Sequence, residues 1–330
     1  MSTKGPKTVV IDDGALEELG GLIGEYSKPL CVTDEMIHAD YSEHLEKYIG
    51  IPCKWLMASE YRADSNTILG NIDIVLGFGG GSSLDVAKLV ARDTGLNWIS
   101  IPTAASHDGI ASEVASVSHN GYKYSEKCKA PLAVVADTSI ISKAPSKLKL
   151  AGLGDIICKT SSLAEWRMAF EAKGESFDGS VYSIVENALN AVLRDDSLET
   201  LIRAEIDAGR AMSIFGSSRP CSGTEHAISH AMDRDISQLH GLQVAFATPL
   251  CLHYLNEAGY SNHRSEDIRK FMTDRNMPTT LDQMMITSDQ FLSAIQHGLS
   301  IMEKRDRYSI LRHLNVDDES LKRTMISLGY

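Results

Sequence analysis

The first 150 residues alternate short apolar runs with segments of helical periodicity. The apolar runs are rich in β-branched residues and lie at 7–11, 29–33, 53–57, 72–76, 98–101 and 132–136. Most are continuous, which is typical of parallel strands that are buried on both faces. Helical patterns lie between them, at 15–23, 36–48 and 84–92. The alternation predicts an open α/β sheet.

Two features mark changes along the chain. Asn120-Gly121 is a strong short-range hairpin signal, and it predicts a β-hairpin beside the sheet. From about residue 145 the strand-like runs disappear, and helical periodicity is clearest at 181–193, 198–215, 225–232, 242–256 and 290–304. We therefore expect an α/β, Rossmann-like nucleotide-binding domain over residues 1–145 and an all-α domain over residues 146–330.

Charge and composition narrow the class of protein. Asp and Glu outnumber Lys and Arg by 44 to 32, and no basic run offsets the net charge of -12, which disfavours a nucleic-acid partner. The uncharged stretch 236–256 contains too many polar side chains for a membrane span, and the N-terminus lacks the apolar run of a signal peptide. None of the six cysteines forms a C-x-x-C pair, so we expect free thiols with no assigned role. These features predict a soluble, cytoplasmic protein of the size of an enzyme.

A glycine-rich turn follows the fourth predicted strand, in IDIVLGFGGGSSLDVAK. Glycines at 77, 79, 80 and 81 permit positive φ and close approach of a ligand to the backbone. We expect Ser82 to cap the next helix, with Asp85 in a capping-box position. Free N–H groups at that helix start would suit a pyrophosphate, and the alternative is a tight turn without a ligand. Asp34, after the second strand, could accept ribose hydroxyls and favour NAD over NADP, or it could simply cap a helix.

Imidazoles and a carboxylate form the second constellation. His226 and His230 lie four residues apart in SGTEHAISHAMD and would share one helix face, and His240 follows them. Asp155 stands at a predicted glycine-flanked helix entry, in GLGD. Two imidazoles and a carboxylate would leave an open position on a Zn²⁺-like ion, whereas the alternative for each histidine is an ordinary hydrogen-bonded residue.

A third segment, IPTAASHDGIAS at 101–112, lies just past a predicted strand. Its small residues and its polar pair His107-Asp108 suit a ligand cleft at the carboxyl end of a sheet. The alternative is a helix start that Ser106 or Asp108 caps.

Together, GFGGGSSLDVAK, PTAASHDGIAS, GLGDII and SGTEHAISHAMD…LHG resemble the sn-glycerol-1-phosphate dehydrogenases. That family belongs to the metal-dependent superfamily of glycerol dehydrogenase and the iron-containing alcohol dehydrogenases, with dehydroquinate synthase a more distant relative. The resemblance spans roughly residues 7–260 and implies a dehydroquinate synthase-like or glycerol dehydrogenase-like fold.

The resemblance also implies site residues. Asp155, His226 and His240 would hold a catalytic Zn²⁺, with Fe²⁺ or Ni²⁺ used by some relatives. Asp108 and His230 would be catalytic residues that contact the substrate, and Asp155 would contact the substrate as well. Beside Asp34, the residues that would line NAD or NADP are Gly79, Gly80, Gly81, Ser82, Ser83, Thr103, Ala104, Ala105, Ser106 and Ser112.

The implied reaction is reduction of dihydroxyacetone phosphate by NADH or NADPH to sn-glycerol 1-phosphate, a backbone of ether lipids, by a homo-oligomer. The ion would polarise the ketone while hydride arrives from the nicotinamide. The proton would come from His230 or through a water-linked route along the ribose. For the substrate phosphate we consider Arg219, His107 and Lys159.

Three other functions stay open. One is a related dehydrogenase of another phosphorylated or phosphonate ketone, or of a polyol. The second is a sugar-phosphate cyclase that uses NAD transiently, although Asp155, where dehydroquinate synthase would have glutamate, favours a dehydrogenase. The third is a metabolite-sensing protein, which the complete ligand set disfavours. Some positions differ from the family pattern: Glu113, Cys158-Lys159-Thr160, Leu242 and Ala245.

Overall fold

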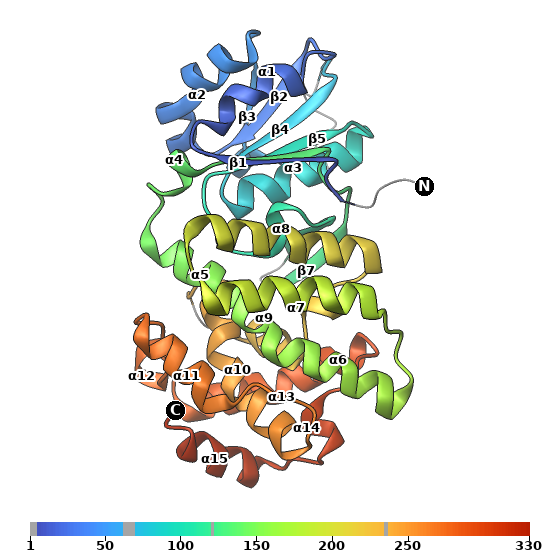
Figure 1. The fold of residues 1–330 in the computed structure, drawn as a ribbon, viewed down its shortest axis with the longest axis vertical. Coiled ribbons are helices and arrows are strands. Elements are labelled where there is room, and N and C mark those ends of the chain that lie inside the picture. Colours follow the sequence, from blue (N-terminus) through green and yellow to red (C-terminus); the bar gives the residue numbers. More distant parts are fainter. Residues whose placement is uncertain (1–4, 62–69, 120–121, 234–236) are drawn as a thin grey trace. The chain divides into compact units, whose positions relative to one another are not determined.

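The computed structural model describes residues 5–61, 70–119, 122–233 and 237–330 (Figure 1). The chain forms two compact units. The first comprises Met1–His119, Tyr124–Lys149 and Asp196–Ile214, and the second comprises Asn120–Lys123, Leu150–Asp195 and Phe215–Tyr330.

A six-stranded sheet forms the centre of the first unit, in the order β1-β8-β5-β4-β2-β3. All of its strand pairs are parallel, so the predicted α/β sheet is confirmed. The strands are β1 (Thr8–Asp12), β2 (Pro29–Thr33), β3 (Lys54–Met57), β4 (Ile74–Gly79), β5 (Trp98–Pro102) and β8 (Ala133–Asp137). Four of them, β2, β4, β5 and β8, are buried along their whole length, which explains their continuous apolar sequences.

Helices cover both faces of this sheet. On one face, α1 (Leu19–Leu22) and α2 (Glu35–Ile49) pack with Leu76 and Phe78 of β4. On the other face, α3 (Gly81–Thr94) packs so closely that a Cβ on Gly77 would lie 2.8 Å from the Cβ of Ala87. Because β2 and β4 are neighbours whose following helices lie on opposite faces, the chain reverses its winding there. Ligands of open α/β sheets bind at such a point.

The predicted hairpin strands are present as a separate two-stranded sheet, β6 (Val114–His119) with β7 (Tyr122–Lys127). The Asn120-Gly121 turn itself lies outside the described residues. After β8 comes the short helix α4 (Thr138–Ile141). The last element of the first unit is α8 (Leu198–Phe215), whose bounds match the predicted helix.

The position of α8 differs from the sequence-based division, which put residues 146–330 together. Gly209 gives the physical reason: a Cβ there would lie only 2.6 Å from the backbone oxygen of Asp108. The helix therefore rests directly on the backbone of residues 108–112, which belong to the first unit.

The second unit is helical. Its helices are α5 (Ser146–Ile157), whose first turn belongs to the first unit, α6 (Lys159–Lys173), α7 (Gly179–Arg194), α9 (Thr224–Met232), α10 (His240–Glu257), α11 (Ser265–Asp274), α12 (Leu281–Met284), α13 (Ser288–Lys304), α14 (Ile310–His313) and α15 (Asp318–Ser327). Its main apolar core gathers side chains such as Ile228, Phe246 and Phe291 from α9, α10 and α13. Within the described residues, no strand follows Asp137, as the loss of strand-like runs predicts.

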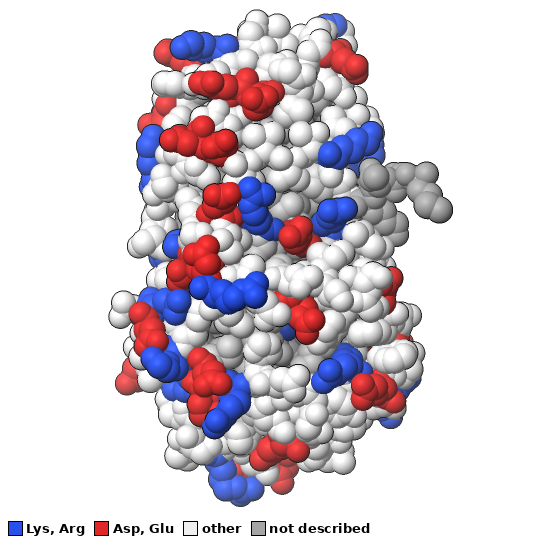
Figure 2. Space-filling model, viewed as in Figure 1, with Lys and Arg blue, Asp and Glu red and all other residues white. Residues whose placement is uncertain are grey.

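Among the described residues, no helix is both long and apolar enough to cross a membrane. Acidic and basic side chains are both scattered over the face of the molecule that Figure 2 shows.

Candidate active site

The glycine turn joins β4 to α3, and close packing explains most of its glycines. A Cβ on Gly79 would lie 2.6 Å from Ser83 Oγ, and one on Gly81 would lie 2.3 Å from His107 Nε2. A Cβ on Gly80 would meet nothing within 4 Å, so the space beside it is open to a ligand. The expectation of positive φ is wrong for this turn, because none of its glycines adopts it.

The start of α3 lacks the predicted cap. Gly80 is the N-cap and makes no side-chain bond, while Ser82 lies exposed in the first turn. Asp85 forms an ion pair with Lys88 at 2.9 Å and accepts a hydrogen bond from Ser116 N, so it does not complete a capping box. The prediction of a Ser82 cap is therefore wrong. An uncapped helix start leaves its N–H groups for an anion.

Asp34 caps a helix, which is one of the two roles considered from the sequence, and it also adjoins the glycine turn. Its Oδ1 caps α2 by accepting hydrogen bonds from the backbone N–H groups of Met36 and Ile37. Its Oδ2 would lie 3.4 Å from a Cβ on Gly79, so this oxygen adjoins the glycine turn. One oxygen of the carboxylate thus has a structural role, and the other lies where a ligand at the turn would meet it.

The segment after β5 borders the same turn. Thr103 N donates to Gly79 O at 3.0 Å, and Ala104 and Ala105 are buried. The 3-10 helix Asp108–Ile110 is capped by His107, whose Nδ1 accepts from Gly109 N, so neither Ser106 nor Asp108 is the cap. This bond orients the Nε2 edge of His107 toward Gly81. His107, considered above for the substrate phosphate, therefore lies at the glycine turn.

The remaining residues predicted around the dinucleotide fall into two groups. Ser83 and Ser112 are buried, and Ser112 Oγ donates to Val114 O at 3.3 Å. Ser106 and Asp108 are partly exposed.

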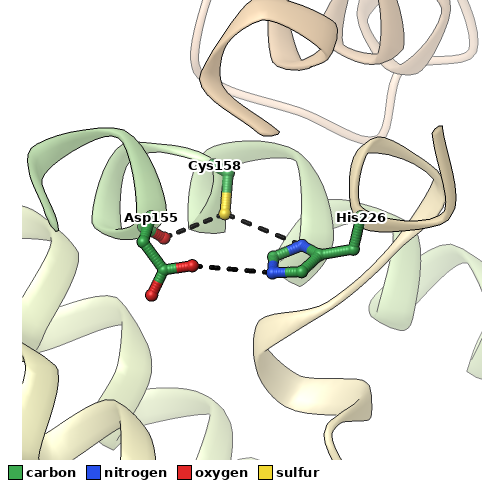
Figure 3. A group of neighbouring side chains, drawn as sticks. All are labelled: Asp155, Cys158 and His226. Carbon is green, nitrogen blue, oxygen red and sulfur yellow. Dashed lines mark hydrogen bonds and ion pairs between the residues drawn. The ribbon is translucent and has the colours of Figure 1, made fainter. Parts of the chain in front are cut away.

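In the second unit, Asp155, Cys158 and His226 form a buried cluster (Figure 3). Asp155 Oδ1 lies 3.6 Å from His226 Nε2. Two ligands of one tetrahedral Zn²⁺, with bonds of about 2.0–2.2 Å, stand roughly 3.4 Å apart, so this spacing fits a shared ion. Carboxylate and imidazole are ligands that Zn²⁺ and Fe²⁺ both accept. The donor set and its spacing therefore suit a divalent metal.

Two facing glycines bring these groups together. A Cβ on Gly154 would lie 2.2 Å from Gly241 O, and one on Gly241 would lie 1.9 Å from Ala151 O. The backbones of α5 and α10 therefore touch where Asp155 and His240 follow and precede a glycine. The prediction that Asp155 stands at a helix entry is wrong, since it lies near the end of α5.

His240 is the first residue of α10 and lies beside the cluster. Its ring centroid is 5.3 Å from that of His226 and 5.6 Å from that of His230. His240 Nδ1 lies 2.9 Å from Ser229 Oγ, and His230 Nδ1 lies 3.9 Å from Asp233 Oδ2. The structure thus brings the predicted Asp155, His226 and His240 into one neighbourhood, although the tight group of ligand atoms has Cys158 in place of His240.

Cys158 was given no role from the sequence. Its Sγ donates to Asp155 O at 2.9 Å and lies 3.9 Å from His226 Nδ1. The sulfur of Cys158 thus lies nearest to Nδ1 of His226, whereas Asp155 lies nearest to Nε2 (Figure 3). The signal was the D-x-x-C spacing, which places Cys158 one helical turn from Asp155.

Glu225 is a second residue that the sequence reasoning missed. This fully buried carboxylate accepts from Gly223 N at 2.7 Å and from Ser161 Oγ at 2.9 Å, and it lies 2.9 Å from His226 Nδ1. Because a carboxylate accepts hydrogen bonds, it holds the proton of His226 on Nδ1 and leaves Nε2 to face Asp155.

Electrostatics reinforce this arrangement. Burial favours the neutral form of Asp155, but Lys159, His226 and His240 hold the pKa of Asp155 well below its usual range. Burial also opposes protonation of His226, yet Cys158, Asp155 and Glu225 raise the pKa of His226 well above its usual range. Each shift favours the charged form of its group, and the two charges attract each other.

Arg219, considered for the substrate phosphate, has other partners. Its Nε donates to Glu175 Oε2 at 2.8 Å, its Nη1 lies 3.4 Å from Glu165 Oε2, and its Nη2 donates to Tyr308 O at 3.2 Å. The side chain is 5% exposed. Each of its guanidinium nitrogens thus has a partner within the second unit.

Comparison with known proteins places the chain among dehydrogenases. Residues 10–145 match the family model described as iron-containing alcohol dehydrogenase. The chain is 32% identical to a glycerol-1-phosphate dehydrogenase (NAD(P)+) of Methanosarcina acetivorans, over 93% of this chain and 90% of that protein. It is 36% identical to the protein of the same name from Archaeoglobus fulgidus, over 78% and 76% of the two chains.

Solved structures agree on the fold. The chain superimposes on a probable glycerol dehydrogenase from Sinorhizobium meliloti with a TM-score of 0.76 and 21% identity, covering 98% of this chain and 96% of that one. The glycerol dehydrogenase of Schizosaccharomyces pombe gives a TM-score of 0.74 at 17% identity, covering 99% and 92%. The expected glycerol dehydrogenase-like fold is confirmed.

Proposed function

Because the chain belongs to the glycerol-1-phosphate dehydrogenase family, we propose that it catalyses the reversible, NAD(P)H-dependent reduction of dihydroxyacetone phosphate to sn-glycerol 1-phosphate. The observation that carries this proposal is the buried pair of Asp155 Oδ1 and His226 Nε2, 3.6 Å apart. A pair of this kind can hold a Lewis acid against a ketone oxygen.

The bound groups supply the reactive chemistry: a divalent ion polarises the ketone, and a reduced nicotinamide provides the hydride. Asp155, His226 and His240 are the proposed metal ligands, with Zn²⁺ expected first and Fe²⁺ or Ni²⁺ as alternatives. Glu225 orients the ring of His226 through the Nδ1 bond at 2.9 Å. With its proton held on Nδ1, the ring presents the lone pair of Nε2 to the metal on the side that faces Asp155.

On the substrate, His230 and Asp108 are the proposed catalytic contacts. The ring of His230 lies beside His240, 5.6 Å between centroids, so it adjoins the proposed metal ligands. His230 can therefore pass a proton to the product oxygen, with a water-linked route along the ribose as the alternative. Arg219 and Lys159 are the proposed phosphate partners in this unit. Arg219 is the weaker of the two, because each of its guanidinium nitrogens already has a partner within the unit.

The dinucleotide is proposed to bind at the turn between β4 and α3. The uncapped N–H groups at the start of α3 suit its pyrophosphate, and Gly80 leaves room for close approach. Asp34 Oδ2, which adjoins this turn, could accept ribose hydroxyls and would repel a 2′-phosphate, which favours NAD over NADP.

Two further properties are proposed from the family alone: a cytoplasmic location and a homo-oligomeric state. The net charge of -12 favours small-molecule substrates over nucleic acid as partners.

The test is the initial rate of NADH oxidation with dihydroxyacetone phosphate on Zn²⁺-reconstituted protein, followed by chiral analysis of the product. We expect a rate that a chelator abolishes and that greatly exceeds the rate with unphosphorylated dihydroxyacetone. NADH binding without turnover of this substrate would reject the proposal in favour of a dehydrogenase of another ketone. Product formation from a sugar phosphate without net NADH consumption would indicate the cyclase instead.

A further inference from the structure

Lys159 is a fully buried lysine beside the proposed metal site. It lies at the start of α6, one helical turn after Asp155, and 0% of its surface is exposed. Its Nζ lies 3.4 Å from Asp155 Oδ2. A buried ammonium is costly unless a carboxylate compensates its charge. The ion pair with Asp155 therefore allows Lys159 to be buried where α5 meets α6.

The two oxygens of Asp155 have different neighbours. Oδ2 lies next to the ammonium of Lys159, whereas Oδ1 lies 3.6 Å from His226 Nε2. The oxygen that would bind a metal is therefore distinct from the oxygen that the lysine holds. Lys159 can stay in place when a metal binds, and it would then remain a positive charge close to that metal.

A second buried lysine provides a comparison within the same chain. Lys88 of α3 is also 0% exposed, and its Nζ lies 2.9 Å from Asp85 Oδ1 and donates to Val114 O at 2.8 Å. Asp85 uses its other oxygen to accept a backbone hydrogen bond from Ser116. Both lysines neutralise a carboxylate within their own helix region, but only the carboxylate beside Lys159 also faces an imidazole.

We propose that Lys159 is a permanent counter-ion of the metal site, which stabilises the metal-free protein and weakens the affinity for a divalent cation. This inference rests on the metal site of the proposed function. In the metal-free protein the ammonium compensates the buried charge of Asp155, so the site folds without its ion. In the metal-bound protein the same ammonium repels the ion and draws negative charge away from its ligand.

The charge of Lys159 predicts a change in metal affinity of opposite sign to that expected for a residue that only supports a metal ligand. Removal of a hydrogen-bonding partner from a metal ligand usually weakens metal binding by about 10–100-fold. Removal of a cation beside the metal should strengthen it. The sign of the change in affinity thus separates a counter-ion from a residue that only supports the fold.

The experiment compares Lys159→Met, Lys159→Gln and Lys159→Arg with Lys88→Met as the matched buried control. Each protein is stripped with a chelator, its thermal midpoint is recorded, and its Zn²⁺ dissociation constant is measured by competition with a chromophoric chelator. We expect Met and Gln at 159 to lower the midpoint of the stripped protein and to tighten Zn²⁺ binding by about ten-fold or more. Lys159→Arg, which keeps the charge, should restore the wild-type Zn²⁺ affinity.

Lys88→Met should lower the midpoint and leave Zn²⁺ affinity unchanged. If Lys159→Met does not fold, Lys159→Gln against Lys159→Arg decides, because these two differ in charge and both can donate to Asp155. Unchanged or weakened Zn²⁺ binding in the neutral variants overturns the inference while the metal site stands. Absence of Zn²⁺ binding by the wild type overturns the metal site and the inference with it.

Discussion

Gly154 and Gly241 face each other so closely that a Cβ on Gly154 would lie 2.2 Å from the carbonyl oxygen of Gly241. These residues are 87 positions apart in the sequence, and each is the direct neighbour of a proposed metal ligand, Asp155 or His240. The glycines of GLGD and LHG therefore serve the same purpose. They allow α5 and α10 to touch, which sets the position of both ligands.

Gly241→Ala should weaken the site and the fold together. The new methyl group would lie within 1.9 Å of the Ala151 oxygen, so the two helices must separate. We expect a loss of about 1–3 kcal/mol in the free energy of unfolding, as for overpacked cores, and weaker Zn²⁺ binding. Chemical denaturation and metal titration measure the two effects. Gly179→Ala is the control, because a Cβ there meets nothing within 4 Å, and it should change neither.

Glu225→Gln should reduce metal affinity by about 10–100-fold, because the neutral amide holds the His226 ring less firmly and donates as well as accepts. Zn²⁺ competition titration of the stripped protein is the measurement. The control is Glu257→Gln. The Glu257 side chain is 56% exposed, and its carboxylate lies 3.4 Å from His253. Equal Zn²⁺ affinity in Glu225→Gln and wild type would contradict the role assigned to Glu225.

Arg219→Met should destabilise the protein by about 3–5 kcal/mol, since it leaves two carboxylates without their buried cation. Urea unfolding checks this value, with Arg312→Met as the control. Arg312 pairs with Glu303 at the surface, where such a pair contributes about 0–1 kcal/mol.

The same variant tests the phosphate prediction. If Arg219→Met kept wild-type stability but raised the Michaelis constant for dihydroxyacetone phosphate alone, the guanidinium would be a substrate contact. Because Arg219 forms ion pairs with Glu165 and Glu175, we expect a large loss of stability and little change in that Michaelis constant.

Asp34→Ser should distinguish the capping role of Asp34 Oδ1 from the proposed role of Oδ2 in binding the dinucleotide. Serine retains the cap of α2, so unfolding free energy should stay within about 0.5 kcal/mol, whereas Asp34→Ala should cost about 1 kcal/mol. Both variants remove the carboxylate beside the glycine turn. Their ratio of kcat/KM with NADPH to that with NADH should therefore rise in parallel, and an unchanged ratio in both would mean that Asp34 is only a cap.

Local patterns in the sequence predicted most of the fold. The strand β2 has the predicted bounds because an apolar, β-branched run between turn residues leaves little choice of conformation. The helix predicted over 15–23 is instead a 3-10 helix followed by α1, since Gly14, Gly20 and Gly21 weaken helical propensity there. Short helices such as α12 and α14 had no clear periodicity to reveal them.

The site was predictable only where a residue carries a recognisable motif. His226 and His240 were predicted in that way. In the structure His226 Nε2 lies 3.6 Å from Asp155 Oδ1, and the ring of His240 lies 5.3 Å from that of His226. Glu225 and Arg219 were not understood, because their roles depend on contacts with residues far away in the sequence. Glu165 illustrates the difficulty. It forms an ion pair with Arg219 and accepts a hydrogen bond from Thr224, but nothing in its local sequence shows that it is buried.

The membership of α8 in the first unit has a consequence for protein synthesis. A ribosome releases the six strands of the sheet first, then α5, α6 and α7 of the second unit, and only afterwards Leu198–Phe215. Until that helix emerges, the backbone at Asp108–Ser112 lacks the surface that Gly209 brings against it. The packing of this segment is therefore completed only by a later part of the chain, and neither unit is a continuous stretch of sequence.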